Sequence, residues 1–174
     1  MKKDGIILLN KVKGISSFKA INQIKWNIGA SKIGHAGTLD PMAEGLMVVM
    51  VNSATKFSED LMKKDKEYYV EMELGYETDT YDAEGKKTKI YDGIIEYDEQ
   101  NVRDVINSFV GIQDQIPPMY SALKVNGRKM YEMAREGIEI ERKPRRVEIY
   151  SIRDITIKGE MITFYVEVSS GTYI

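Results

Sequence analysis

Short apolar runs alternate with polar and glycine-rich segments along the whole chain. Two runs, GIILL at 5–9 and LMVVMV at 46–51, are unbroken and predict buried strands. Residues 68–74 alternate between apolar and polar side chains, which predicts a strand with one buried face. Two further strands are predicted at 147–152 and 161–168, adjacent to each other and joined through 154–160.

Helices are predicted where apolar residues recur at helical spacing. Ser16 and Ser17 both offer an N-cap to a helix that ends at Gly29. The other predicted helices run from Ser53 toward Lys63, from a cap at Asp98, and over 128–135.

The segments between these elements carry turn-forming residues. They are predicted as loops at 33–41 and 75–93, with a turn at 82–85, and as extended chain at 115–121. Strands and helices do not alternate strictly, so a doubly wound parallel sheet is disfavoured. The pattern predicts an α+β fold with a mixed, mostly antiparallel sheet and flanking helices.

The composition is that of an ordinary globular protein, 43% hydrophobic and 30% charged over 174 residues. No cysteine is present, which excludes disulfides and thiolate metal sites and favours a reducing, cytoplasmic compartment. With His35 as the single histidine, we expect no metal site. The opening MKKDGIILLNK is too briefly apolar for a signal peptide, and no stretch is long enough to span a membrane.

The charges are unevenly distributed, although the net charge is only -2. Residues 1–58 carry a net charge of +5, residues 59–104 carry -8, and residues 120–150 carry +3. Basic regions separated by an acidic one can form a positive face that binds nucleic acid. The same distribution also fits plain solvated surface, and charge alone leaves both interpretations open.

The segment GHAGTLDPMAEGLMVV places a lone carboxylate, Asp40, directly before Pro41. Proline restricts the residue before it, and Gly37 permits close approach of another backbone. A carboxylate held this way, ahead of a buried strand, suits a nucleophile or a general base, although Asp before Pro is also a common turn residue. Glu44, four residues on, raises the alternative of a carbohydrate hydrolase with paired carboxylates.

Five blocks along the chain together resemble one family, the TruB-type tRNA pseudouridine synthases. In chain order, these blocks are GIILLNKVKGISSFKAIN, GHAGTLDPMAEGLMVV, DKEYYVEMELGYETDTYDAEG, PPMYSALKVNGRKMYEMAREG and VEVSSGTYI. The family converts the T-loop uridine of tRNA (position 55) to pseudouridine. The resemblance implies the pseudouridine synthase catalytic-domain fold over residues 1–174, with no cofactor.

The resemblance also implies roles for individual residues. Asp40 matches the catalytic aspartate, and Tyr68, chosen over Tyr69 by its spacing to Leu74-Gly75, matches the tyrosine that stacks on the target base. The residues expected to bind or support the substrate are Lys11, His35, Gly37 and Lys124.

The resemblance further implies a binding partner and segments that the family carries after the last residue of this sequence. The expected partner is the T-arm of tRNA, bound by a monomer. In the family an arginine follows Gly-Thr-Tyr-Ile and pairs with the catalytic aspartate, and a small RNA-binding (PUA) domain follows the catalytic domain. This sequence ends at Ile174, so we expect an incomplete catalytic domain without the PUA domain. A non-catalytic tRNA-binding module or folding chaperone is therefore an alternative for this chain.

Overall fold

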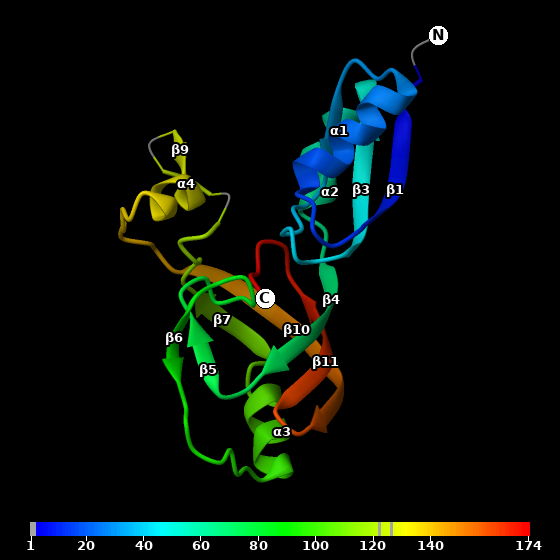
Figure 1. Cartoon of the computed structure of the whole chain (residues 1–174). Helices are drawn as coiled ribbons and strands as arrows, with labels where there is room; N and C mark the ends of the chain where they lie inside the picture. Colours follow the sequence, from blue (N-terminus) through cyan, green and yellow to red (C-terminus); the bar gives the residue numbers. More distant parts are fainter. Residues whose placement is uncertain (1–2, 122, 126) are drawn as a thin grey trace. The chain divides into compact units, whose positions relative to one another are not determined.

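The computed structural model describes residues 3–121, 123–125 and 127–174, and Figure 1 labels its elements. The chain divides into two compact units, residues 1–64 and residues 65–174. Each strand pair described in either unit is antiparallel, and helices accompany the sheets. The predicted α+β class is therefore confirmed. Within the described residues, no helix is long and apolar enough to cross a membrane.

The first unit is built on a three-stranded sheet in the order β1-β3-β2. The strands are β1 (Gly5–Lys11), β3 (Gly45–Val51) and β2 (Ile33–His35). Because side chains alternate along β3, Met47 and Val49 point to one face and pack with Ile21 of the helix α1 (Ser17–Ile28). Met50 points to the other face and packs with Ala54 of the 3-10 helix η1 (Asn52–Phe57).

The helix α1 has the boundaries that its sequence signals predict. The Ser16 hydroxyl accepts a hydrogen bond from the Lys19 amide at 3.2 Å, which satisfies one of the unpaired amides of the first turn. Gly29 ends the helix in the left-handed conformation, with φ of 62°, where a side chain would be disfavoured. The single tryptophan, Trp26, lies on the outer side of this helix with 81% of its surface exposed.

The second unit is built on a four-stranded sheet in the order β4-β11-β10-β7. The strands are β4 (Lys66–Glu73), β11 (Met161–Val168), β10 (Arg145–Lys158) and β7 (Gly111–Gln115). Helix α3 (Glu99–Asn107) begins at Asp98, whose carboxylate accepts a hydrogen bond from the Gln100 amide at 3.1 Å. The predicted pairing of 147–152 with 161–168 and the predicted cap at Asp98 are both confirmed.

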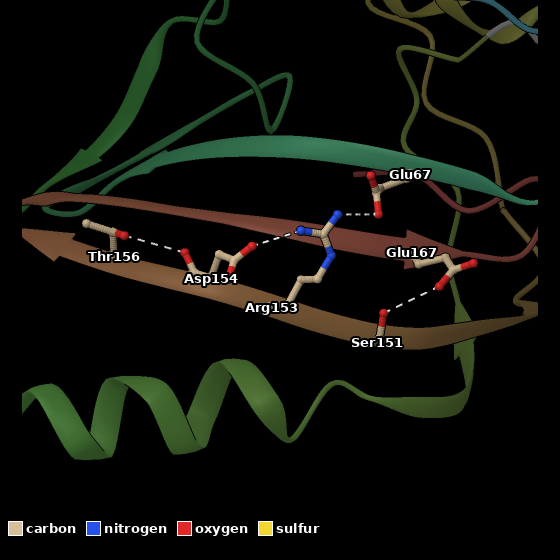
Figure 2. Close-up of polar contacts among 6 residues, drawn as sticks. All are labelled: Glu67, Ser151, Arg153, Asp154, Thr156 and Glu167. Atoms are coloured by element: carbon tan, nitrogen blue, oxygen red, sulfur yellow. Dashed lines mark hydrogen bonds and ion pairs between the residues drawn. The ribbon is translucent and has the colours of Figure 1, made fainter.

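Strand β10 is longer than predicted and is interrupted by a bulge. The pairing with β11 shifts register between Arg153 and Thr156, and Asp154 has a φ of 57°. Figure 2 shows the Arg153 guanidinium between two carboxylates, with nitrogen–oxygen distances of 2.7 Å to Glu67 and 2.8 Å to Asp154. Arg153 therefore links β10 to β4 across the strand that separates them, and its guanidinium carbon lies 4.4 Å from the centre of the Tyr165 ring.

Several local predictions were wrong. The loop predicted at 33–41 contains β2, and the polar stretch 75–93 contains the hairpin β5 (Tyr76–Thr78) and β6 (Lys87–Ile90). The helix predicted from Ser53 is instead η1 followed by α2 (Ser58–Met62). The helix predicted over 128–135 is α4 (Met130–Arg135), preceded by a hairpin of β8 (Lys124–Val125) and β9 (Arg128–Lys129). The run 46–51 is not fully buried, because Leu46 is 65% exposed.

Candidate active site

The residue that precedes Asp40 is held to helix α1 by one buried hydroxyl. The Ser17 Oγ donates to the Leu39 carbonyl at 2.7 Å and accepts from the Leu39 amide at 2.9 Å. Ser17 is only 3% exposed, so water does not compete strongly for these bonds. The Leu39 side chain also packs against the cluster formed by Ile21, Met47 and Val49. The backbone and the side chain of Leu39 together fix the position of the chain directly before Asp40.

The residue that follows Asp40 is held to the turn after β1. The Pro41 carbonyl accepts hydrogen bonds from the Gly14 amide at 2.8 Å and from the Lys11 ammonium at 3.4 Å. Gly14 has a φ of 85°, which a glycine adopts without strain. The chain is therefore fastened on both sides of Asp40, by contacts with segments far away in the sequence.

Lys11 is almost completely buried, at 1% exposure. A buried ammonium is costly unless its donors are satisfied, and the Lys11 Nζ also donates to the carbonyls of Val12 at 3.0 Å and Ile15 at 2.9 Å. These bonds make Lys11 a support of the loop. Its predicted contact with substrate stays a prediction.

Asp40 itself is exposed, between two anchored neighbours. Its carbonyl accepts from the Ala43 amide at 3.1 Å, which closes a tight turn over residues 40–43. This segment is a turn and not a helix, so the helical geometry that would place Glu44 on one face with Asp40 is absent. The turn presents one carboxylate to solvent on a loop with limited freedom, as a nucleophile or general base requires.

His35 and Gly37 contact each other directly before this turn. The His35 Nδ1 lies 2.6 Å from the Gly37 carbonyl oxygen. Since a carbonyl can only accept, Nδ1 carries the proton, and in the neutral ring Nε2 is left as an acceptor. His35 ends β2, so the sheet and this hydrogen bond together set the orientation of the ring.

Tyr68 and Lys124 belong to the second unit. On β4 the pleat sends Tyr68 and Tyr69 to opposite faces. Tyr69 is 54% exposed and its ring centre lies 5.0 Å from that of Tyr165, whereas Tyr68 is half-buried, opposite Val166 in the register. Lys124 is exposed at the start of β8.

The pKa of Lys66, at the start of β4, is lowered because partial burial disfavours its ammonium. Asp65 opposes this effect by attraction.

The structure thus brings Lys11, His35, Gly37 and Asp40 together in the first unit, while Tyr68 and Lys124 lie in the second. Sequence reasoning missed the roles of Ser17 and Gly14. The signal for Ser17 was the doubled serine at 16–17, of which a helix needs only one as its cap. No group of three or more His, Cys, Asp or Glu side chains that could hold a metal ion exists among the described residues.

Comparison with known proteins gives a consistent result. The family model described as "TruB family pseudouridylate synthase (N terminal domain)" matches residues 25–174. The proteins named tRNA pseudouridine synthase B from Fusobacterium nucleatum and Clostridium kluyveri are 47% and 44% identical to this chain, with 98% of it covered. The chain spans only 59% and 58% of the lengths of those two relatives. It spans 74% of the relative of the same name from Endomicrobium trichonymphae, at 44% identity.

A solved structure supports the same assignment. The chain matches one titled "Crystal Structure of a Cbf5-Nop10-Gar1 Complex" with a TM-score of 0.73 and 29% identity, over 98% of this chain and 41% of that one. Sequence and fold agree, and the chain belongs to the TruB family of pseudouridylate synthases.

Proposed function

We propose that this chain forms part of the catalytic domain of a tRNA pseudouridine synthase that isomerises the T-loop uridine of tRNA. The observation that carries the proposal is the exposed carboxylate of Asp40, held between Leu39 and Pro41, which are each anchored to other elements. The names of the curated relatives, tRNA pseudouridine synthase B, support the choice of substrate.

The proposed reaction explains why one carboxylate suffices. The glycosidic bond of a stacked base is out of reach, so the target uridine must first leave the stack. The bond between N1 of uracil and C1′ of ribose then breaks, the ring turns, and C5 bonds to C1′. The hydrogen of C5 leaves as a proton, and N1 gains a proton from solvent. Asp40 serves as the nucleophile or as the group that stabilises charge and moves the proton. The product is an isomer of the substrate, so no oxidant or co-substrate is consumed.

The other residues take roles around this step in the proposal. Tyr68 provides the aromatic face on which the flipped base stacks, a contact worth about 1–3 kcal/mol per base. His35 and Gly37 directly precede the Asp40 turn, and we expect them to bind the nucleotide, to which the Nε2 of His35 can offer a hydrogen-bond acceptor. Lys11 and Lys124 contribute positive charge toward the phosphates of the T-arm.

The test measures release of tritium from a T-arm stem–loop that carries uridine labelled at C5. We expect the chain to release tritium, and we expect Asp40→Asn to slow release by at least about 10³-fold, as loss of an essential catalytic group does. The matched control is Glu44→Gln, another exposed carboxylate four residues away, which should change the rate only slightly.

The outcomes separate the functions considered. RNA binding without any tritium release would overturn the enzymatic proposal and favour a binding module. The carbohydrate hydrolase predicts instead that the chain binds no RNA, and that Glu44→Gln is as damaging to its activity as Asp40→Asn.

A further inference from the structure

Two adjacent serines open helix α1, and they bond to different partners. The hydroxyl of Ser16 accepts from the Lys19 amide and caps the helix. Among the described residues, the hydroxyl of Ser17 bonds to the backbone of Leu39, 22 residues along the chain, and to no amide of the helix. Ser17 is buried at 3% exposure, so its hydroxyl satisfies its hydrogen bonds with the protein backbone and not with bulk water.

We propose that Ser17 is a positioning residue for the reaction at Asp40. This inference rests on the proposed function and deepens it. The Leu39 carbonyl belongs to the peptide group that joins Leu39 to Asp40, and the Leu39 amide belongs to the peptide group before it. A single hydroxyl that binds both fixes two consecutive peptide planes, the second of which adjoins the Asp40 backbone.

The neighbouring contacts show why this hydroxyl controls the placement of the carboxylate. On the far side of Asp40, the Gly14 amide and the Lys11 ammonium hold the Pro41 carbonyl. The backbone is thus held both before and after Asp40. Without the Ser17 hydroxyl the Leu39 backbone is no longer held in place, and a misplacement of about 1 Å can slow a reaction about 100-fold.

The test compares Ser17→Ala with Ser16→Ala in the 174-residue chain. Single-turnover tritium release and the Kd for the labelled T-arm are measured at a temperature where circular dichroism shows both variants fully folded. We expect Ser17→Ala to lower the single-turnover rate about 10- to 100-fold with Kd unchanged within twofold. Ser16→Ala should keep nearly the original rate, because the Ser16 hydroxyl caps the helix through the Lys19 amide and bonds to no described residue of the Asp40 loop.

The positioning role is overturned if Ser17→Ala releases tritium as fast as Ser16→Ala. It is also overturned if Ser17→Ala raises the Kd but leaves the single-turnover rate unchanged. A general loss of structure would lower both the rate and the affinity for RNA. A lower rate with an unchanged Kd therefore excludes a general loss of structure.

A second measurement separates this inference from the proposed function. If the unsubstituted chain releases no tritium, the enzymatic proposal fails by itself. Amide hydrogen exchange then reports on the loop directly: we expect the Leu39 amide to exchange at least about tenfold faster in Ser17→Ala, while the Ile21 amide in the same helix is unchanged. Unaltered exchange at Leu39 would refute the idea that Ser17 holds the loop.

Discussion

At the scale of single residues, Tyr68 and Tyr69 show how position within a strand decides chemistry. The two side chains are neighbours in sequence and identical in type, yet they point to opposite faces of β4. Tyr69 packs against Tyr165 on a face that also carries the ion pair between Arg153 and Glu67. Tyr68 lies on the opposite face, across from Val166 in the register, and its role as the stacking residue stays a prediction.

This difference predicts separable effects of two alanine substitutions. Tyr68→Ala should weaken T-arm binding by about 1–3 kcal/mol, through loss of base stacking. Tyr69→Ala should leave RNA binding unchanged and lower the unfolding free energy, because it removes a packed aromatic pair. Fluorescence anisotropy with labelled RNA and urea unfolding measure the two effects, and weaker binding in Tyr69→Ala alone would contradict the assignment.

Tyr68→Phe refines this prediction. Phenylalanine keeps the stacking face, so binding should survive. If turnover is nevertheless lost, the Tyr68 hydroxyl has a role beyond stacking.

The sequence identified Asp40 by local signals and most other candidates through the family resemblance, but it could not identify their partners. Asp40 was singled out because proline and glycine surround it, and these are local signals. The contact of Ser17 with Leu39 spans 22 residues and that of Lys11 with Pro41 spans 30. Such contacts depend on how α1 and β1 pack in the folded unit, which no local pattern encodes.

At the scale of elements, the helices and strands that carry a local sequence signal were predicted well. Helices α1 and α3 each carry a polar cap residue at the start, and the alternation of β4 marks its two faces. The missed elements were short strands whose existence depends on a partner. Strand β2 has only three residues and is a strand because β3 lies beside it, and β5 and β6 are mutual partners in a polar segment.

The cap of α3 gives a test of stability that does not involve the site. Asp98→Ala removes the acceptor for the Gln100 amide and should lower the unfolding free energy by about 1 kcal/mol. Asp98→Asn keeps a side-chain oxygen that caps about equally well, so it should cost much less. Urea unfolding followed by far-ultraviolet circular dichroism compares the two variants, and an equal cost would show that the negative charge matters more than the cap.

At the scale of the whole molecule, charge divides along the same boundary as the two compact units. Residues 1–64 carry ten lysines and no arginine against five acidic residues, a net of +5, and residues 65–174 therefore carry a net of -7. The unit that contains Asp40 is thus the basic one. We therefore expect the proposed RNA partner to be attracted mainly to this unit, since phosphate contacts supply most of the sequence-independent affinity.

This division predicts how single lysines affect the salt dependence of binding. Lys13 is exposed and precedes Gly14, whose amide holds the Asp40 loop, so it lies where phosphates should pass. Lys13→Gln should reduce the slope of log K against log salt by about 0.7–0.9, the amount expected for one lost phosphate contact. Lys89→Gln is the control, because Lys89 pairs with Glu77 at 2.9 Å in the acidic unit. Equal slopes in the two variants would contradict a binding surface on the basic unit.

The exposed position of Trp26 determines what fluorescence can report about this protein. An indole that is already 81% exposed in the folded chain keeps a water-like emission maximum when the chain unfolds. Tryptophan emission is therefore a poor measure of folding here, and an iodide quencher should reach the ring even in the native state. The same exposure makes Trp26 a built-in probe for any molecule that docks across the outer side of α1. If T-arm RNA protects Trp26 from iodide quenching, the bound nucleic acid extends as far as the outer side of this helix.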